Sequence, residues 1–421
     1  MNDQFTFSPS RRALVGSGAL ALSSATFGFH PRAVASEDSA KVSSEQDGDV
    51  FRAAVKLKTP KSGKDKRMPR PLDSVSCSVF VPRDVKVLRG ATLNPFYEPT
   101  VGQKHWRATA RVWNFAHIGF NFFGVKQDEQ GETALAALKA LAKASGHPEL
   151  EHAPLCIHGM SIGGGLTSRL VAAMPSRVIA AAPVCLEVGP RDKPSGEVPM
   201  VTVFGEKDGR QMEKLMEKLP AARGNHARWA IVPQWKERHT WHMASNMVIP
   251  FYDRVIAARL PDDSDATDGP VQLKPLKESD GWLGDIKAWR TPSPKIAPFS
   301  DYQGDTAAAC WLPNAHAASL WQAFVAHDSP IQIESPHGIS GRNPFKAFPA
   351  GEPFEVKVAT DQGFTPTKLE LYDGDRLLGE FDRETNSATI EPKRGIHALI
   401  GVATSQDGVK SYSSPHALVV L

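Results

Sequence analysis

The sequence is poor in cysteine, in net charge and in long apolar runs. Its 421 residues include four cysteines, Cys77, Cys156, Cys185 and Cys310, whose spacing fits neither a zinc site nor a disulfide framework. The formal net charge of +3 is too small to indicate nucleic acid or an anionic membrane as a partner. The composition, 41% hydrophobic and 23% charged, is typical of a globular protein, and the length favours two domains.

The most continuous weakly apolar stretch lies near the N-terminus. Ser10-Arg11-Arg12 begins a twin-arginine pattern, and residues 33–35, Ala-Val-Ala, form a small-residue cleavage signature. The stretch between them is too short and too rich in glycine and serine to span a membrane stably. We therefore predict that residues 1–35 are a removed twin-arginine export signal. The mature protein would then be periplasmic or secreted from a bacterium, with no integral membrane segment.

A serine between glycines marks the middle of the chain. The apolar run at 155–157 leads into Gly159-Met160-Ser161-Ile162-Gly163, and a helical pattern follows. Strand, tight turn and helix, with serine at the apex, are typical of a nucleophile elbow. Glycine avoids clashes across such a turn. The pattern predicts Ser161 as nucleophile and the Ile162 N–H as an oxyanion donor, at a helix N-terminus that favours negative charge.

A serine nucleophile needs a base, and the base needs an orienting acid. Asp208 follows the apolar run at 199–204, and His239 follows the run at 227–232. The order Ser161, Asp208, His239 is the one expected after an elbow. Both residues follow predicted strands, at the edge of a parallel sheet where ligands bind. They are therefore the predicted acid and base.

Other residues could take these roles. Glu206 and Glu187 are alternative acids near the same strand ends, and His242, three residues after His239, is an alternative base. The neighbours of His242 are apolar, which suits a packed residue, whereas His239 follows three charged residues. His158 directly precedes the elbow, and we interpret it as a packed histidine at the end of a strand.

The second oxyanion donor is expected in the loop after Leu93. Asn94 and Phe96 are the candidates, because Pro95 between them has no N–H to donate.

Apolar runs alternate with helical patterns from about Ser76 to Leu260, which predicts a mostly parallel sheet covered by helices on both faces and a catalytic domain at 36–260. The basic run at 56–70, broken by proline and glycine, is interpreted as a solvated loop.

The remaining sequence changes in character twice. Residues 261–330 are irregular and rich in tryptophan, and we predict a wrap packed on the catalytic domain, because aromatic side chains at this density need burial. Residues 331–421 alternate as short strands, with Asp373-Gly374 as a predicted two-residue hairpin turn. They predict a β-sandwich.

The span from about Ser76 to Leu260 resembles the α/β-hydrolase superfamily, in particular its secreted bacterial serine esterases. The motifs that carry the resemblance are the elbow, the turn at 204–208 and the histidine loop before the last helix. The resemblance implies the same nucleophile, acid and base. The sequence departs from the family in lacking a His-Gly-Gly-Gly oxyanion run. Residues 331–421 resemble a bacterial immunoglobulin-like domain.

These observations predict an exported serine hydrolase that cleaves carboxylic esters through an acyl-enzyme on Ser161. The expected partner is an ester, either free or attached to a polymer, and the mechanism requires no metal or organic cofactor. A serine peptidase or an acyltransferase would use the same residues. A non-catalytic surface-binding protein on the same fold is the alternative from a different class.

Overall fold

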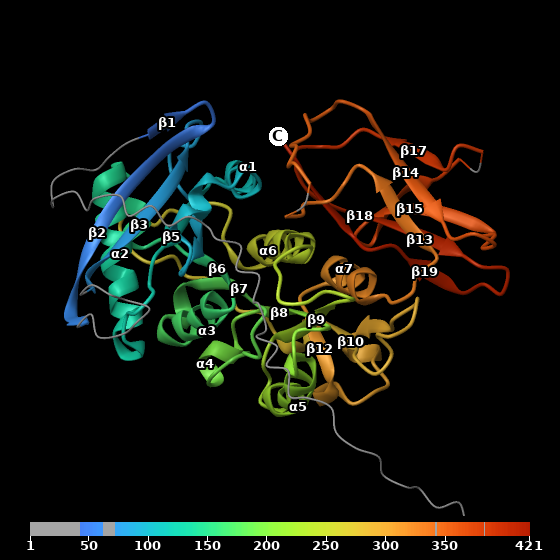
Figure 1. Cartoon of the computed structure of the whole chain (residues 1–421), viewed down its shortest axis with the longest axis horizontal. Coiled ribbons are helices and arrows are strands. Elements are labelled where there is room, and N and C mark those ends of the chain that lie inside the picture. The colour runs from blue at the N-terminus through green and yellow to red at the C-terminus, as the bar shows by residue number, and fades with distance from the viewer. Residues whose placement is uncertain (1–42, 62–71, 342, 383) are drawn as a thin grey trace, which may run out of the picture. The chain divides into compact units, whose positions relative to one another are not determined.

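The computed structural model of the chain describes residues 43–61, 72–341, 343–382 and 384–421 (Figure 1). The predicted export signal at 1–35 lies outside these ranges. Within them, no helix combines the length and apolarity that a membrane crossing requires.

A nine-stranded sheet forms the centre of the catalytic part, in the order β1-β2-β3-β5-β4-β6-β7-β8-β9. Strands β1 to β3 are antiparallel, and from β5 to β9 all neighbours run parallel. This is the α/β-hydrolase arrangement, which confirms the predicted fold class. The strands are β1 (Ser43–Glu45), β2 (Gly48–Lys61), β3 (Leu72–Pro82), β4 (Gly90–Asn94), β5 (Phe115–Phe120), β6 (Leu155–Met160), β7 (Val178–Val184), β8 (Met200–Gly205) and β9 (Trp229–Gln234).

Helices cover both faces of this sheet, with α1, α6 and α7 on one side and α2, α3 and α5 on the other (Figure 1). Strands β5 to β9 are almost wholly buried, as expected of parallel strands between two helical layers. The α-helices are α1 (Lys104–Trp113), α2 (Gln130–Ser145), α3 (Ile162–Ala173), α4 (Lys193–Gly196), α5 (Gln211–Gly224), α6 (Ala244–Arg259) and α7 (Ala315–Val325). The 3-10 helices are η1 (Glu98–Gly102), η2 (Gln127–Glu129), η3 (Pro148–Glu151), η4 (Pro175–Arg177), η5 (Glu278–Asp280), η6 (Phe299–Asp301) and η7 (Thr306–Ala308).

The prediction of a solvated loop at 56–70 is wrong over its first part, because β2 extends to Lys61 and pairs with β3. Val55 and Leu57 turn toward the protein, whereas Lys56 and Lys58 are exposed. The lysines occupy only the solvent face of a strand with a period of two. Residues 62–71 of the predicted loop lie outside the described ranges.

The tryptophan-rich segment packs against the last strand of the central sheet. It forms a small sheet of β10 (Trp282–Asp285), β11 (Ile296–Pro298) and β12 (Ala309–Leu312). Trp289, Trp311 and Trp321 are buried. The Trp321 indole N–H donates to the carbonyl of Ile231 in β9 at 3.1 Å. The Trp311 indole N–H likewise donates to the Glu278 carbonyl at 3.0 Å, so these aromatic side chains are part of the fold.

The C-terminal segment is a β-sandwich, as predicted. One sheet has the order β13-β14-β17, and the other has β16-β15-β18-β19, with β20 also paired to β18. Ile331, Val358, Leu371 and Leu399 belong to the apolar core of this unit. The strands are β13 (Ile331–Ser335), β14 (Phe354–Thr360), β15 (Lys368–Asp373), β16 (Arg376–Glu380), β17 (Ser387–Ile390), β18 (Gly395–Thr404), β19 (Lys410–Tyr412) and β20 (His416–Val420).

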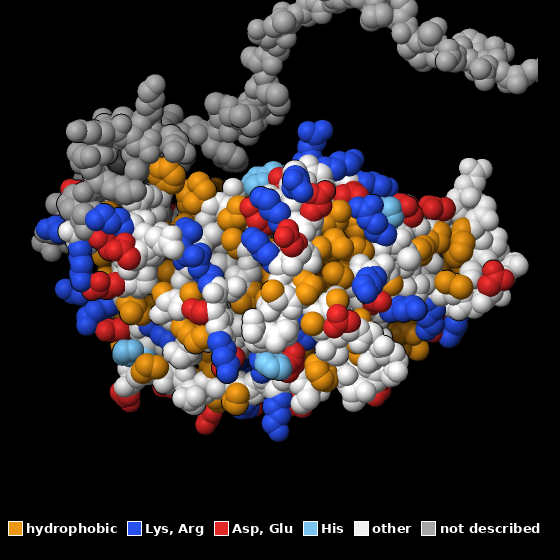
Figure 2. Space-filling view, turned by 90° about the horizontal axis from the view of Figure 1, so that it is seen from below, with side chains coloured by type: hydrophobic (Ala, Val, Ile, Leu, Met, Phe, Trp, Pro, Cys, Tyr) orange, Lys and Arg blue, Asp and Glu red, His pale blue; other side chains and the backbone are white. Residues whose placement is uncertain are grey.

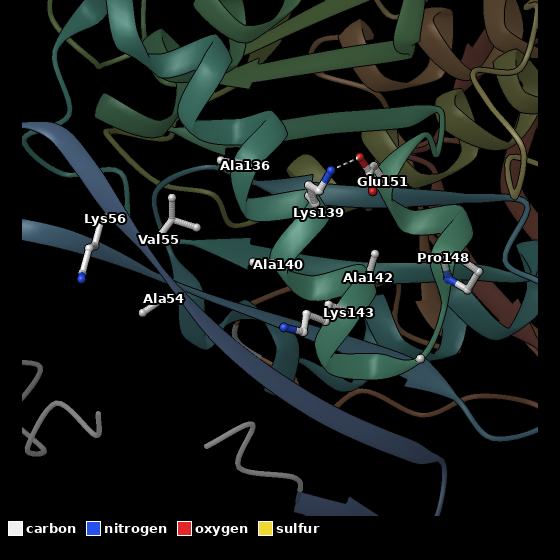
Figure 3. Close-up of a pocket in the computed structure, with 11 residues that line it drawn as sticks. Ala54, Val55, Lys56, Ala136, Lys139, Ala140, Ala142, Lys143, Pro148 and Glu151 are labelled. Atoms are coloured by element: carbon white, nitrogen blue, oxygen red, sulfur yellow. Dashed lines mark ion pairs between the residues drawn. The ribbon is translucent and has the colours of Figure 1, made fainter. Parts of the chain in front are cut away.

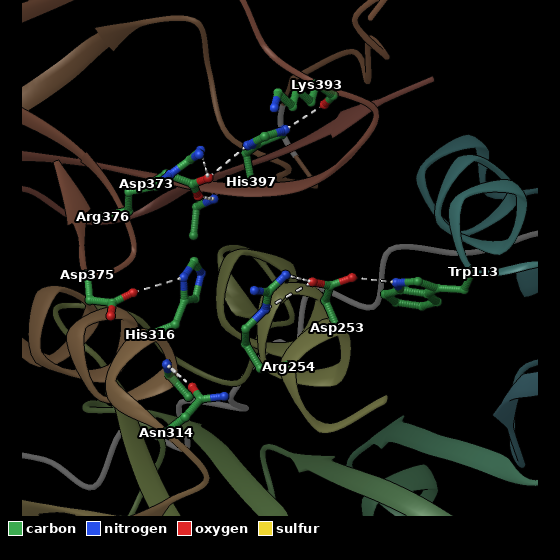
Figure 4. Close-up of polar contacts among 12 residues, drawn as sticks. Trp113, Asp253, Arg254, Asn314, His316, Asp373, Asp375, Arg376, Lys393 and His397 are labelled. Atoms are coloured by element: carbon green, nitrogen blue, oxygen red, sulfur yellow. Dashed lines mark hydrogen bonds and ion pairs between the residues drawn. The ribbon is translucent and has the colours of Figure 1, made fainter. Parts of the chain in front are cut away.

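Polar contacts join the sandwich to helix α7 (Figure 4). Gly374, in the turn after β15, has φ +60°, and a β-carbon there would lie 2.2 Å from His316 Nδ1. Asp375 Oδ1 lies 3.4 Å from the same nitrogen. Burial raises the pKa of Asp373, but the hydrogen bonds from His397 Nδ1, at 2.9 Å, and the Ala398 N–H, together with nearby positive charge, outweigh burial and lower the pKa to about 2. The turn thus fits closely over α7.

The sandwich and the catalytic part also share apolar packing and a buried hydrogen bond. Ile396 and Val419 of the sandwich belong to the same apolar cluster as the central sheet. Asn246 in α6 is fully buried, and its Oδ1 accepts the Ala417 N–H of β20 at 2.9 Å. Helix α6 is therefore attached to both parts.

We expect Asn246→Ala to lower the free energy of unfolding by about 2–3 kcal/mol, because it leaves the buried Ala417 N–H without an acceptor. Chemical denaturation measures the loss. The exposed Asn225, directly after α5, provides the control, since its side chain donates to the Ala221 carbonyl of that helix, and Asn225→Ala should cost below about 0.5 kcal/mol. Equal losses in the two variants would contradict the role given to the Asn246 bond.

Candidate active site

Ser161 stands at a strained turn between β6 and α3. Its backbone has φ 56° and ψ −119°, a region that a non-glycine residue occupies only when its surroundings enforce it. The Ser161 N–H donates to the carbonyl of Val184 in β7 at 2.8 Å. A β-carbon at Gly159 would lie 2.6 Å from the backbone of Gly163, so the turn requires glycine there. The structure thus has the backbone geometry predicted for the elbow.

The three glycines after Ile162 each meet a different neighbour. A β-carbon would lie 3.2 Å from Phe96 Cβ at Gly163, 3.1 Å from the Val184 carbonyl at Gly164, and 3.1 Å from Leu186 Cδ2 at Gly165. The start of α3 is therefore closely packed on three sides, while the Ile162 side chain is 46% exposed.

The predicted acid and base are hydrogen-bonded to each other. His239 Nδ1 donates to Asp208 Oδ2 at 2.8 Å. The histidine side chain is 43% exposed and the carboxylate 14%. Gly205, at the end of β8, allows this approach, because a β-carbon there would lie 2.0 Å from the carbonyl oxygen of Arg238. The loop after β9 thus lies directly on the loop after β8.

Backbone contacts relate this pair to the elbow. Ser161 bonds to Val184, and the next residue, Cys185, donates its thiol hydrogen to the carbonyl of Thr240 at 3.1 Å. Thr240 is adjacent to His239 in sequence. Ser161 and His239 therefore lie at one edge of the sheet, next to the same segment after β7.

Two residues that were not predicted contact the acid. Gln211 Nε2 donates to Asp208 Oδ2 at 2.7 Å and to the Cys185 carbonyl at 3.3 Å. Burial, and then the nearby charge of Asp208, raises the pKa of the Cys185 thiol to about 12. Gln211 begins α5 three residues after Asp208, a spacing that could have indicated it, whereas Cys185 looked like any small apolar residue.

Cys185, Asp208 and His239 are also residue types that bind Zn²⁺, and their potential ligand atoms lie within 4.8 Å of one another. A metal would need the thiolate, which burial disfavours here, and the carboxylate that already holds the imidazole. The geometry fits a hydrogen-bonded acid and base better than a metal centre.

The alternative acids have other partners. Glu206 accepts the Lys236 backbone N–H at 2.9 Å and a guanidinium hydrogen of Arg290 at 3.2 Å. Glu187 accepts from Lys214 Nζ at 2.9 Å, and this hydrogen bond lowers its pKa. Neither carboxylate is hydrogen-bonded to a histidine within the described residues.

The alternative base points toward a different carboxylate. His242 is 14% exposed, and its Nδ1 lies 3.0 Å from Glu237 Oε1. The packed position expected for His242 agrees with this low exposure. His239 is thus the histidine that the structure pairs with Asp208.

The predicted oxyanion loop lies against the elbow. Phe96 contacts Gly163, and its ring packs edge-on against Phe123 at 6.0 Å. The Asn94 side chain points into its own loop, where Oδ1 accepts the N–H groups of Phe96 at 3.1 Å and Tyr97 at 3.0 Å. The Phe96 N–H thus already has an intramolecular acceptor, and the second donor stays a prediction.

A depression of about 650 Å³ lies elsewhere, between β2 and α2 (Figure 3). Val55, Ala140 and Lys143 are among its lining residues, and Lys139 on its rim pairs with Glu151 at 3.1 Å. None of the predicted site residues lines it.

His158 is packed in the core, as expected. It is fully buried and stacks on Trp106 with ring centroids 4.0 Å apart. Neither ring nitrogen has a hydrogen-bond partner among the described residues. Burial lowers its pKa well below 6.5, and burial lowers the pKa of the nearby His117 to about 3. Both rings are therefore neutral in the folded protein at neutral pH.

These two histidines make stability depend on pH. Because their pKa values are depressed in the folded state, the unfolded chain binds more protons as the pH falls below 6.5, and stability decreases with falling pH. The two groups together contribute about 3 kcal/mol per pH unit between about pH 4 and 6. We predict that His158→Phe, which keeps a stacking ring, reduces proton uptake on unfolding by about one. Denaturation at several pH values measures it, and an unchanged uptake would rule out a neutral His158.

Comparisons with known proteins give partial structural matches. Solved structures similar to parts of the chain include a methylesterase, with 16% identity over 52% of this chain and 56% of that chain and a TM-score of 0.33. A ferulic acid esterase matches with 13% identity over 50% and 99% of the two chains and a TM-score of 0.33. Fibronectin(III)-like modules of Clostridium thermocellum CbhA match with 24% identity over 21% and 93% and a TM-score of 0.19.

No protein-family model and no curated protein matches the sequence. The chain spans little more than half of the methylesterase. Structural similarity at these scores carries no functional inference, so the function is inferred from the site itself.

Proposed function

We propose that the protein is a serine hydrolase that cleaves carboxylic esters through an acyl-enzyme on Ser161. The observation that carries the proposal is the His239–Asp208 hydrogen bond, formed at the same sheet edge as the strained serine turn. A nucleophile, a base and an orienting acid are the three groups that this chemistry needs.

In the proposed mechanism the Ser161 Oγ attacks the acyl carbon of the ester while His239 Nε2 takes the hydroxyl proton. The Asp208 carboxylate accepts the Nδ1–H, which fixes the tautomer and stabilises the imidazolium. His239 then gives the proton to the departing alcohol. Water repeats the sequence on the acyl-enzyme: His239 takes its proton, the acid is released and Ser161 recovers its hydrogen.

The negative charge of the tetrahedral intermediate needs preorganised donors. We assign the Ile162 N–H to this role, because it is the first N–H of α3 and the helix N-terminus favours an anion. The loop of Asn94 and Phe96 would supply the second donor, and the Phe96 N–H could do so by exchanging its Asn94 acceptor for the oxyanion.

Gln211 donates a second hydrogen bond to Oδ2 of Asp208, the proposed acid. A carboxylate oxygen that accepts two hydrogen bonds is held in one orientation. Gln211 is thus proposed as a positioning residue, acting through Asp208 and not on the substrate.

The proposed substrate is an ester outside the cytoplasm, either free or attached to a polymer, and the twin-arginine pattern motivates the proposed export. Positive and negative side chains are interspersed over the face shown in Figure 2, so that face offers no strong field for a polyanion such as nucleic acid. A peptidase or an acyltransferase would need the same groups, and a fluorophosphonate probe tests the shared nucleophile. Labelling at Ser161 would exclude a purely non-catalytic binding protein.

We predict that Ser161→Ala lowers kcat for an activated acetyl ester by about 10³-fold or more without loss of folding. Hydrolysis assays measure kcat, and thermal unfolding shows whether the variant is folded. Ser168→Ala, on the same helix, is the matched control, because that hydroxyl bonds to the Gly189 carbonyl at 3.2 Å; we expect activity within about threefold. An active Ser161→Ala protein would refute the proposed nucleophile.

The two histidines three residues apart give a second test. His239→Ala should lower kcat about as much as loss of Ser161, because nucleophile and base act as a unit. His242→Ala should cost well under ~10²-fold, since His242 contacts Glu237 and not the proposed acid. Steady-state kinetics of the two variants, with their melting curves, distinguish these roles. If His242→Ala proves to be the inactive variant, the base is His242.

A further inference from the structure

Helix α3 carries an arginine that none of the proposed catalytic steps uses. Arg169 lies two helical turns after Ser161 and is partly exposed. On an α-helix, long side chains lean toward the N-terminus and lie over the residue four positions earlier. Here that residue is Gly165: a β-carbon built on it would lie 3.3 Å from Arg169 Nη1. The guanidinium therefore extends along the helix toward Ser161.

A buried amide holds the guanidinium in this position. Arg169 Nε donates to Gln130 Oε1 at 2.7 Å, and Gln130 is itself 5% exposed, with its Nε2 bonded to the Val125 carbonyl at 3.1 Å. The glutamine thus occupies only the Nε–H of the arginine. No other described residue bonds to the two terminal nitrogens, which are thus open to a ligand from this part of the chain. The guanidinium has also lost much of its rotational freedom before any ligand binds.

Besides Gln130, the neighbours that the structure shows for this group are the apolar Leu186 and the positively charged Arg191. The Leu186 side chain also lies against Gly165, where a β-carbon would be 3.1 Å from Leu186 Cδ2. Within the described parts of the chain no carboxylate pairs with Arg169. Burial, and then the charge of Arg191, lowers its pKa, but an arginine stays protonated at neutral pH. Among the described residues the charge therefore has no counter-ion.

The Arg169 guanidinium lies near the proposed nucleophile, Ser161. Leu186 follows β7 by two residues, on the same segment whose Val184 carbonyl holds the Ser161 N–H. Gly165 lies four residues along α3 from Ser161, about 6 Å along the helix axis. A substrate bound to Ser161 and extended along α3 would bring a group a few bonds from its ester to the guanidinium.

We infer that Arg169 forms an anion subsite, which selects esters bearing a second, ionised acid group a few bonds from the scissile carbonyl. A planar guanidinium with two free terminal nitrogens matches a carboxylate in a bidentate manner. The inference rests on the proposed function and deepens it, because it defines the substrate class as monoesters of dicarboxylic acids or esters of acidic alcohols.

Two matched pairs of esters test the subsite and locate the charge. Monomethyl adipate against methyl hexanoate places the carboxylate on the acyl side, and 4-acetoxybenzoate against its methyl ester places it on the leaving group. In at least one of the two pairs, the wild-type protein should prefer the anionic ester by at least about tenfold in kcat/KM. The preference should lie mainly in KM, since the carboxylate is bound equally in the ground state and the transition state.

Substitutions at Arg169 test whether this residue causes the preference for anionic esters. Arg169→Gln should reduce the anionic-to-neutral ratio of kcat/KM by about 10- to 100-fold. Arg169→Lys, which keeps the charge without the fork, should give an intermediate ratio. Arg191→Gln removes a neighbouring exposed charge and should change the ratio less than about threefold. Melting curves show whether each variant is folded. If Arg169→Gln does not fold, the ratio measured for Arg169→Lys tests the subsite instead.

The outcomes separate this inference from the proposed function. Hydrolysis of neutral esters without preference for either anionic one would overturn the subsite and leave the serine hydrolase intact. If Arg169→Gln and Arg191→Gln have equal effects, the preference for anionic esters comes from a diffuse positive field and not from a subsite at Arg169. If no ester is hydrolysed and a fluorophosphonate does not label Ser161, the proposed function fails and the subsite fails with it.

Discussion

The candidate site depends first on the backbone turn at Ser161. A non-glycine residue in this conformation costs about 1–3 kcal/mol, so the surrounding structure must hold it. The Val184 carbonyl fixes its N–H, and the bare backbone of Gly159 lets the start of α3 approach β6. The direction of the serine hydroxyl is thus a property of how β6, β7 and α3 pack, and mutations in those elements act on the site without touching it.

The elbow motif and the chain order were enough to predict the serine, the acid and the histidine loop, because each follows an apolar strand whose end lies at the same sheet edge. The structure adds that Asp208 and His239 share a hydrogen bond; their catalytic roles stay predictions. Gln211 was missed although it follows Asp208 by only three residues. Cys185 was missed because its contact with the acid joins two separate segments of the chain. The direction of Arg169 depends on Gln130 in another helix, which no local pattern reveals.

For the fold, the change from alternating strands and helices to short strands was enough to predict both architectures. The strand β2 was missed because its exposed lysines hid a period of two. The hairpin turn predicted at Asp373-Gly374 is displaced by one residue, since Asp373 ends β15 and the turn consists of Gly374 and Asp375. Asp373 is held in the strand by its hydrogen bonds to β18, at His397 and the Ala398 N–H, a long-range contact that turn propensity does not contain.

The Asn246–Ala417 hydrogen bond has a consequence for how such a protein can change over evolutionary time. Helix α6 begins directly after the histidine loop, and its first turn is tied to the last strand of the sandwich. A recombination event that replaced the sandwich with another module would remove a bonding partner from the helix that ends this loop. The sandwich and the catalytic part are therefore expected to be inherited together, as one cooperative unit and not as exchangeable cassettes.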